Sequence, residues 1–264
     1  MNRKIAIIGG GNLGTAIAEG LIKSKFAKAT DLIITKRNVT TLTAFEKLGV
    51  TISSDNNLAV KKADIIILAV KPFQVKDVLT AIKKDIRVQQ VLVSVVSGIF
   101  IEEIREVIKK PLPVFRAMPN TAIAIRESMT CISYYNATDA HLKYINDLFS
   151  TLGRVVTIDE KLMNAATILG ACGTAYAMRY IRANIQGGIE IGFDAATASL
   201  IAAQTVKGAA ELLLQKGTHP EQEIDKVTTP KGCTIAGLNE MEHQGFSSSL
   251  IKGIAVSYHK IAKD

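Results

Sequence analysis

The sequence of 264 residues lacks the features that mark several common classes of protein. Its three cysteines, Cys131, Cys172 and Cys233, contain no C-x-x-C pair, which argues against a disulfide framework or a zinc knuckle. The four histidines lie far apart and lack zinc-ligand spacing. No stretch approaches the roughly 20 apolar residues of a membrane span, and the apolar run after the basic start is too short for a signal peptide. We therefore expect a protein of the reducing cytoplasm with no metal site and no membrane association.

Acidic residues are too few to balance the basic ones in the first part of the chain. The net charge at neutral pH is +8, and the whole excess lies in residues 1–150. Positive charge placed this unevenly attracts a polyanionic cofactor, although a solvated lysine-rich surface is the alternative. We do not expect nucleic acid as a partner, because the basic residues are dispersed and no aromatic residues alternate with them.

A glycine-rich turn separates the first expected strand, residues 4–8, from the helical pattern that begins at Thr15. Its glycines have the spacing G-x-G-x-x-G. The first permits a tight turn, the second admits a pyrophosphate to the backbone, and the third lets the helix pack on the strand. The free N–H groups of the helix start favour the same phosphates. The turn therefore predicts a dinucleotide site whose contacts are Gly9, Gly11, Asn12, Leu13 and Gly14.

The second apolar run, residues 31–35, ends without a carboxylate. An acidic side chain at this place would bond the ribose 2′-hydroxyl of NAD, whereas a basic one accommodates the 2′-phosphate of NADP. The chain has Lys36 and Arg37 instead, and a guanidinium group suits a phosphate. The alternative is an ordinary basic loop. We predict NADPH as the cofactor, with NADH as the second choice.

Strand and helix patterns alternate as far as residue 158, which predicts a doubly wound, mostly parallel α/β sheet. The further strands are expected at residues 50–52, 63–70, 91–96, 113–118, 129–134 and 154–158. Helices are expected at 73–84, 101–108 and 139–152, and a polar turn at 53–57. Ligands bind beyond the carboxyl ends of parallel strands. The candidate cofactor contacts there are Ala69, Val70, Lys71, Pro72 and Ser97.

The character of the chain changes at residue 159, where strand signals vanish. Apolar and small residues recur at helical spacing through residues 162–186, 194–216 and 234–263. Helices this apolar have little room to bury themselves within about 105 residues, and core-like apolar surfaces are typical of obligate interfaces. We expect two domains, residues 1–158 and residues 159–264, the second being all-helical and forming a homodimer. A compact monomeric helical cap is the alternative.

Residues 227–238 form a polar island within the helical part, with hydroxyls, a proline and a glycine before a helix expected to begin near Thr234. Free N–H groups at a helix start, with threonine hydroxyls beside them, make a carboxylate site. A purely structural interpretation is a capped helix start, with Thr229 or Thr234 as the N-cap. The residues alone leave both interpretations open.

Four stretches, at residues 7–14, 69–72, 116–121 and 227–234, together resemble the pyrroline-5-carboxylate reductase family in order and spacing. The resemblance implies an N-terminal Rossmann domain followed by an all-helical dimerisation domain. It also implies hydride transfer from NAD(P)H to 1-pyrroline-5-carboxylate, giving L-proline in the last step of proline biosynthesis. Dimers of this family commonly assemble into larger rings. By position, Asn56 would touch the adenine-side ribose, and Met118 and Asn120 would lie near the nicotinamide.

The same resemblance implies a site for the substrate carboxylate in the polar island. It is formed by Thr229 with the backbone at Cys233 and Thr234. We add Gly232 of the same loop, and Lys231, whose unusual position suggests an extra cation for the carboxylate. If the reaction uses a proton donor, the Thr234 hydroxyl is our candidate. The chain departs from the family in three places. Residues 170–176 read Gly-Ala-Cys-Gly-Thr-Ala-Tyr where the family has Ser-Gly-Ser-Gly-Pro-Ala-Tyr, Lys231 replaces a glycine, and Ala122 replaces a proline.

These departures keep two alternative functions open. One is a related imine, 2-oxo-acid or hydroxy-acid reductase. An enzyme of the β-hydroxyacid type needs a lysine with an amide or acidic partner, for which Lys161 with Asn164 or Asn184 is a poor match. The other alternative is a degenerate NADP-binding protein that regulates rather than catalyses. Turnover of the imine with NADPH separates these alternatives.

Overall fold

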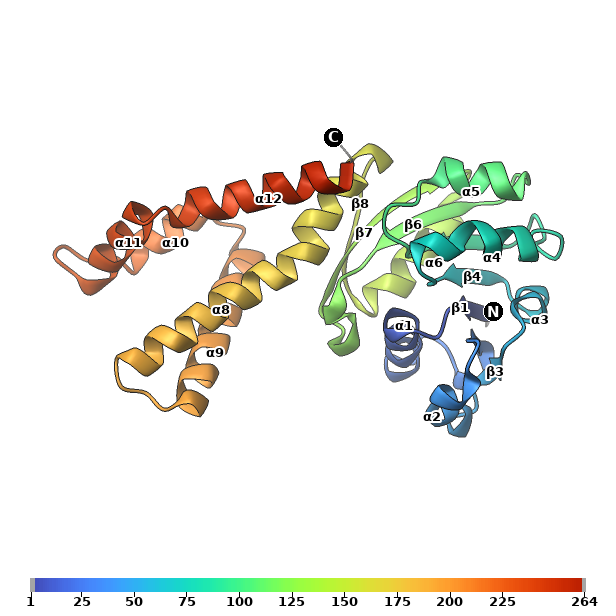
Figure 1. Ribbon diagram of the computed structural model, residues 1–264, viewed down its shortest axis with the longest axis horizontal. Helices are drawn as coiled ribbons and strands as arrows, with labels where there is room; N and C mark the ends of the chain where they lie inside the picture. Colours follow the sequence, from blue (N-terminus) through green and yellow to red (C-terminus); the bar gives the residue numbers. More distant parts are fainter. Residues whose placement is uncertain (1–2, 263–264) are drawn as a thin grey trace. The chain divides into compact units, whose positions relative to one another are not determined.

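The computed structural model describes residues 3–262 of the chain (Figure 1). The chain divides into two compact units, Met1–Cys172 and Gly173–Asp264. The first two residues of the basic start, and the last residue of the helix expected at 234–263, lie outside the described residues.

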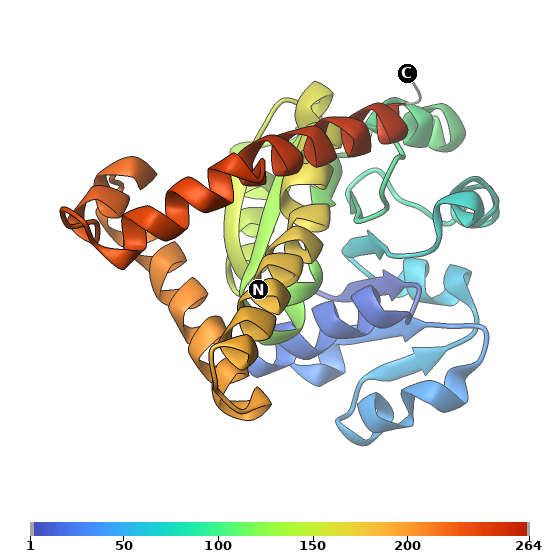
Figure 2. The same ribbon diagram turned by 60° about the vertical axis from the view of Figure 1, so that its left-hand side comes forward.

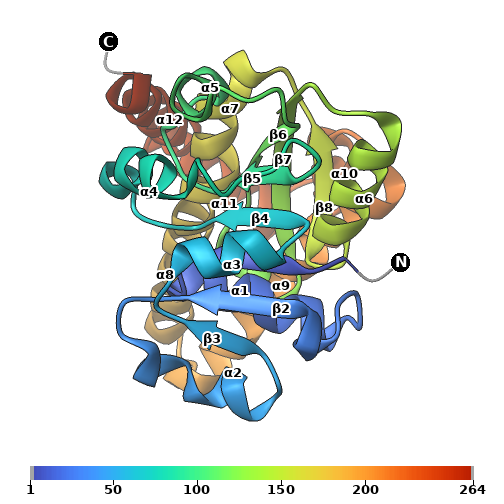
Figure 3. The ribbon, with the colours of Figure 1, turned by 90° about the vertical axis from the view of Figure 1, so that its right-hand side faces the viewer.

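The first unit is built on one eight-stranded sheet with the order β3-β2-β1-β4-β5-β6-β7-β8 (Figure 3). Strands β1 to β6 are parallel, β7 pairs antiparallel with β6, and β8 pairs parallel with β7. The predicted mostly parallel, doubly wound sheet is therefore confirmed. The strands are β1 (Ile5–Ile8), β2 (Leu32–Thr35), β3 (Thr51–Ser53), β4 (Ile65–Leu68), β5 (Val91–Ser94), β6 (Val114–Met118), β7 (Ser128–Tyr135) and β8 (Gly153–Thr157).

Helices cover both faces of this sheet, which explains why its central strands are apolar on both sides. The α-helices are α1 (Asn12–Lys23), α2 (Thr43–Lys47), α3 (Asn56–Lys62), α4 (Val75–Ile82), α5 (Ile101–Ile108), α6 (Asp139–Ser150) and α7 (Met163–Ala166). Short 3-10 turns are η1 (Ala29–Asp31), η2 (Val39–Leu42), η3 (Pro72–Gln74), η4 (Thr121–Ile125) and η5 (Glu160–Leu162), and η6 (Thr167–Cys172) is a π-helix.

Strand β1 shows how the alternation of side chains builds two cores. Ile5 and Ile7 belong to the core under α1 and α6, whereas Ala6 and Ile8 belong to the core under α3, α4 and α5. All four side chains are fully buried. Full burial of a side chain the size of isoleucine contributes about 1.5–3 kcal/mol. The central strands therefore hold the loops at their carboxyl ends in fixed places.

Residues 160–172 pack against β6 and β7, beyond the domain boundary expected after residue 158. Met163 is fully buried in a small cluster with Met118 and Cys131. The first compact unit therefore extends through the π-helix η6, although the strand pattern ends with β8.

The second unit is all-helical, as predicted (Figure 2). Its helices are α8 (Gly173–Glu190), α9 (Ala195–Lys216), α10 (Pro220–Lys226), α11 (Cys233–His243) and α12 (Phe246–Ala262). Helices α8 and α9 form a hairpin that turns at Gly192, with a positive φ of 114°. Helix α12 meets α8 through a hydrogen bond between the Tyr176 and Ser257 hydroxyls, 2.7 Å apart.

This helical unit leaves large apolar side chains exposed. Leu200, Val256 and Ile251 are 71%, 68% and 66% exposed, and among the hydrophobic residues between 173 and 262 only Ala198 and Ala202 are buried. Within the same range no helix combines the length and the apolar character that a membrane crossing needs. The apolar faces are those of a surface made to pack against another protein.

The structure corrects three details of the expected elements. The turn predicted at 53–57 is wrong in its second half, because Asp55 caps helix α3, which begins at Asn56. The helix predicted at 162–186 is interrupted by the π-helix η6, and the helix predicted at 234–263 breaks at Gly245, whose φ is +81°. Helix α10 was not expected.

Candidate functional site

The glycine-rich turn lies at the point where the sheet reverses its strand order. Strand β1 has β2 on one side and β4 on the other, so the loops after β1 and β4 start from neighbouring strands. Gly9 has a φ of +113°, and a Cβ built on it would lie 2.5 Å from the carbonyl oxygen of Ala69. Ligands of open α/β sheets bind in the crevice at such a reversal. The predicted contacts of the two loops are thus brought together.

Each glycine of the turn has its own steric role. A Cβ on Gly14 would lie 2.1 Å from the carbonyl oxygen of Gly9, so only glycine lets α1 pack this close to the turn. Gly11 has no atom within 4 Å of its Cβ position, which leaves open space beside the backbone. Gly11 is also the N-cap of α1, where no side chain caps the helix and no acidic residue stands in the first turn. The N–H groups at this helix start are therefore available to an anion.

The end of β2 carries the residues predicted to select the cofactor. The Thr35 hydroxyl donates a 2.6 Å hydrogen bond to Oδ1 of Asn56, and the Thr35 carbonyl accepts from the N–H groups of Gly9 and Gly10. Lys36 is half-buried and Arg37 is exposed, and within residues 3–262 neither takes part in an ion pair. The structure thus brings Asn56 and the basic pair to the side of the glycine turn. Both cationic groups remain available for a phosphate.

The loop after β4 and the end of β5 supply the other side of the crevice. Ala69, Val70 and Ser97 are half-buried, whereas Lys71 and Pro72 are exposed. The Ala69 N–H donates to the carbonyl of Ile8 at 2.8 Å, which fixes this loop to the end of β1.

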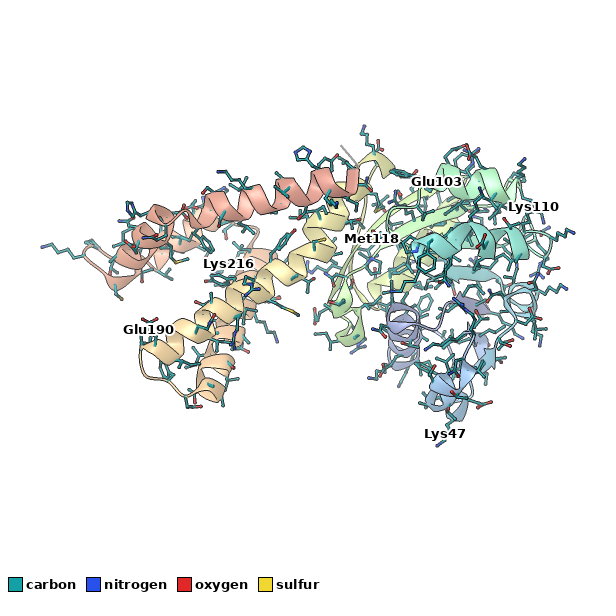
Figure 4. All side chains as sticks on the ribbon, viewed as in Figure 1. Lys47, Glu103, Lys110, Met118, Glu190 and Lys216 are labelled. Carbon is teal, nitrogen blue, oxygen red and sulfur yellow. The ribbon has the colours of Figure 1, made fainter. Side chains whose placement is uncertain are left out.

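Met118 is the last residue of β6 (Figure 4), and Asn120 follows two residues after it. The Met118 side chain is 7% exposed and packs in the cluster with Met163. The Asn120 amide donates from Nδ2 to the carbonyl of Gly170 at 3.1 Å, and its Oδ1 accepts from the Ala122 N–H at 3.0 Å.

The buried Arg116 is a residue of this region to which the sequence assigned no role. It is fully buried on β6, with Nη1 3.4 Å from Oε1 of Glu160 and the guanidinium 4.6 Å from the centre of the Phe100 ring. Its Nε and Nη2 have no hydrogen-bond partner within the described part of the chain. Burial lowers the pKa of Arg116, and Glu160 opposes that shift. A lone charged residue in an apolar strand is the sequence signal that could have identified it.

The polar island in the second unit forms an uncapped helix start. Gly232 is the N-cap of α11, without a side-chain hydrogen bond to the helix, so the alternative interpretation with Thr229 or Thr234 as the N-cap is wrong. A Cβ on Gly232 would lie 2.6 Å from the Thr229 hydroxyl oxygen, which therefore stands beside the helix start. Lys231 has a φ of +59° and is exposed. This left-handed conformation explains why glycine suits the position.

Comparison with known proteins places the chain among reductases of one kind. Residues 160–263 match the family described as pyrroline-5-carboxylate reductase dimerisation, and residues 4–98 match the family described as NADP oxidoreductase coenzyme F420-dependent. The chain is 43% identical to pyrroline-5-carboxylate reductase 2 of Dictyostelium discoideum over 99% of its length and 93% of the relative. The chain belongs to the pyrroline-5-carboxylate reductase family.

Other members include a longer relative and proteins of similar length whose structures are solved. The chain is 47% identical to pyrroline-5-carboxylate reductase 1 of D. discoideum over 98% of its own length, but it spans only about half (49%) of that relative. Among solved structures, a reductase from Coxiella burnetii matches with a TM-score of 0.93 and 26% identity, covering 100% of this chain and 98% of that one. A Plasmodium falciparum reductase with NADP bound matches with a TM-score of 0.90 and 27% identity, over 98% and 97% of the two chains.

The lysine proposed for a dehydrogenase of the β-hydroxyacid type is engaged elsewhere. The exposed Lys161 ammonium lies 3.1 Å from Oδ2 of Asp159. A 3-hydroxyisobutyrate dehydrogenase from Mycobacterium tuberculosis shares 13% identity and a TM-score of 0.55 with this reductase-family chain, which shows a common fold alone.

Proposed function

We propose that this chain reduces 1-pyrroline-5-carboxylate to L-proline with a hydride from NADPH, the last step of proline biosynthesis. The observation that carries the proposal is the pair of uncapped helix starts with glycine at the N-cap, α1 and α11, in a member of this reductase family. One suits a pyrophosphate and the other suits a small carboxylate.

The first unit fits a dinucleotide. The open space beside Gly11 leaves room for the pyrophosphate against the backbone, and the N–H groups of Asn12, Leu13 and Gly14 face it. Asn56 would contact the adenine-side ribose, and Lys36 with Arg37 would bind the 2′-phosphate. Ala69, Val70, Lys71, Pro72 and Ser97 would line the cleft, and Met118 and Asn120 would lie near its nicotinamide end. The bound cofactor supplies the hydride, and the protein supplies position and charge.

The second unit supplies the groups for a carboxylate. The Thr229 hydroxyl and the N–H groups of Cys233 and Thr234 would bind it at the start of α11, with Gly232 allowing the close approach. The Lys231 ammonium would add a cation to this site. We assign the Thr234 hydroxyl, half-buried in the first turn of α11, the role of orienting the imine nitrogen or passing it a proton.

Steady-state turnover with a panel of substrates tests this function. We expect NADPH oxidation with 1-pyrroline-5-carboxylate, measured by NADPH absorbance, and slower oxidation with the six-membered cyclic imine. Preference for a 2-oxo acid would indicate the related reductase instead. Tight NADPH binding with no turnover on any imine would contradict the proposal and indicate a degenerate NADP-binding protein.

The preference for NADPH over NADH is tested at the end of β2. In Arg37→Ala we expect a Kd for NADPH that rises by about tenfold or more, which is the loss of about 1.4 kcal/mol of phosphate binding. The Kd for NADH should stay within about twofold, because NADH has no 2′-phosphate. An equal loss for both cofactors would contradict the assignment of Arg37.

The exposed apolar faces of the helical unit support a homodimer, which we propose is cytoplasmic and further assembled into a ring. The match to a dimerisation family supports the dimer, and the three free cysteines Cys131, Cys172 and Cys233 support a reducing compartment. Sedimentation of the purified chain tests the assembly, and a concentration-independent monomer would contradict it.

A further inference from the structure

Residues 160–172 form an irregular helical segment that ends in the π-helix η6. The segment passes from a 3-10 turn through one turn of α-helix into the π-helix, after which α8 begins at Gly173. A π-helical turn is rare, and it persists where contacts from outside the helix hold it, frequently at functional sites. The contacts that hold η6 are therefore informative.

Strand β6 and the residues just after it hold this segment at three points, two residues apart along the chain. Arg116 lies 3.4 Å from Glu160, Met118 packs on Met163, and Asn120 donates to the carbonyl of Gly170 at 3.1 Å. Alternate residues of a strand point to the same face. One face of β6 and the residues that continue it thus hold the start, the middle and the end of the segment.

Both polar atoms of the Asn120 side-chain amide make hydrogen bonds within the protein. Oδ1 accepts from the Ala122 N–H at the start of η4, and Nδ2 donates to the carbonyl inside the π-helix. The Asn120 backbone N–H also donates to the Ser128 hydroxyl at 3.1 Å. The partners in these three hydrogen bonds, Ala122, Gly170 and Ser128, all belong to the first unit.

The topology of the sheet places this contact near the reacting end of the cofactor. The ribose partner Asn56 lies at the end of β2, and the order β3-β2-β1-β4-β5-β6 continues from there to β6. A dinucleotide crosses the strand ends from one half of the sheet to the other, so its nicotinamide lies toward β5 and β6. The π-helix held by Asn120 flanks that end.

We propose that Asn120 is a positioning residue that acts on hydride transfer through the carbonyl of Gly170 and not by contacting the cofactor. Its hydrogen bond fixes the π-helix η6 beside the nicotinamide end, where a small misplacement is costly to the rate. The effect on the rate rests on the proposed function, whereas the hold on η6 does not.

Asn120→Asp removes the hydrogen-bond donor of the side chain and keeps its acceptor. The carboxylate still accepts from the Ala122 N–H but cannot donate to Gly170. We expect kcat to fall by about tenfold or more, while the Kd for NADPH, measured by fluorescence, stays within about twofold. The primary isotope effect with NADPH deuterated at the transferred position should rise, because hydride transfer becomes slower. The backbone amides of residues 167–172 should exchange hydrogen faster. Asn120→Ser, which keeps an acceptor for Ala122 but cannot reach Gly170, should behave alike if Asn120→Asp folds poorly.

Asn136→Asp is the matched control, because Nδ2 of Asn136 also donates to a backbone carbonyl, that of Pro111 at 3.0 Å. It should leave kcat, the isotope effect and exchange at 167–172 unchanged. The proposal is overturned if Asn120→Asp keeps the wild-type kcat and exchange, or if its Kd for NADPH rises as much as its kcat falls. If the wild-type chain turns over no imine, the proposed function fails, and the exchange comparison still decides whether Asn120 holds η6.

Discussion

The starts of α1 and α11 share an uncapped N-terminus with glycine at the N-cap and no acidic residue in the first turn, but the fold constrains them differently. Other helices of the chain carry a side-chain cap, such as Asp55 on α3, Thr138 on α6 and Asp194 on α9. Glycine in place of a capping side chain costs only roughly a few tenths of a kcal/mol at each start. Helices α2, α4 and α7 also begin without a side-chain cap, but their N-cap residues are not glycine. The glycine N-cap is what α1 and α11 share, and it suits both starts to an anion.

The two starts differ in what makes their glycines necessary. Around α1, Gly9 and Gly14 face backbone carbonyl groups, those of Ala69 and Gly9. Around α11 the neighbour of Gly232 is the Thr229 hydroxyl, and the left-handed position beside it holds Lys231. The first site is set by the backbone and tolerates little change. At the second start, both the hydroxyl and the backbone carbonyl of Thr229 lie beside the glycine.

The largest effect is expected for Gly14→Ala. Its new Cβ would lie 2.1 Å from the Gly9 carbonyl oxygen, so α1 must move away from the turn. We expect the free energy of unfolding to fall by about 1–3 kcal/mol, together with a loss of NADPH binding. Chemical denaturation and NADPH fluorescence measure the two. Wild-type stability in this variant would show that the turn is more adaptable than the backbone contacts indicate.

Gly11→Ala is expected to weaken NADPH binding while leaving the free energy of unfolding nearly unchanged. No atom lies within 4 Å of the new Cβ, and the φ of −83° suits alanine. The free energy of unfolding should therefore stay within about 0.5 kcal/mol of wild type. The Kd for NADPH should rise by about tenfold or more, because the methyl group fills the space that the pyrophosphate needs. Unchanged NADPH affinity would remove this turn from the cofactor site.

Lys231→Gly tests the start of α11. Glycine adopts the φ of +59° without strain, so the fold should be kept. If the ammonium binds the substrate carboxylate, the KM for the imino acid should rise by about two- to fivefold, as expected for an exposed ion pair. The increase should shrink at high salt, and the Kd for NADPH should not change. An unchanged or lower KM would contradict a role for Lys231 in substrate binding.

The sequence predicted the features that follow from local backbone geometry better than those that depend on residues far away in the chain. The parallel strands were predictable because strands buried on both faces are continuous apolar runs, as in β4. The turn at Gly9–Gly14 was predictable because its glycines follow from local backbone geometry. The cap of α11 was not, because a hydroxyl on either side of Gly232 satisfies the same pattern. The π-helix η6 depends on Asn120 and Met118, which are far away in the chain, so no local sequence pattern predicts it.

The smallest effect is expected at Glu223 of α10, the helix before α11. Its carboxylate accepts from the Thr218 hydroxyl at 2.8 Å and lies 2.6 Å from the Lys226 ammonium and 3.5 Å from the Lys216 ammonium. These partners, the Lys226 bond above all, lower the pKa of Glu223 from 4.5 to about 2. A carboxyl group whose pKa is lowered by folding stabilises the fold at a pH above its unfolded-state pKa. This stabilisation is lost as the pH falls through the folded-state pKa.

Glu223→Gln should therefore lower Tm slightly at neutral pH, and the difference should vanish between pH 4.5 and about 2. Glu221→Gln, on the same helix and without an ion pair in residues 3–262, is the control. A Tm difference that persists at the acid end would mean that Glu223 acts through packing rather than charge.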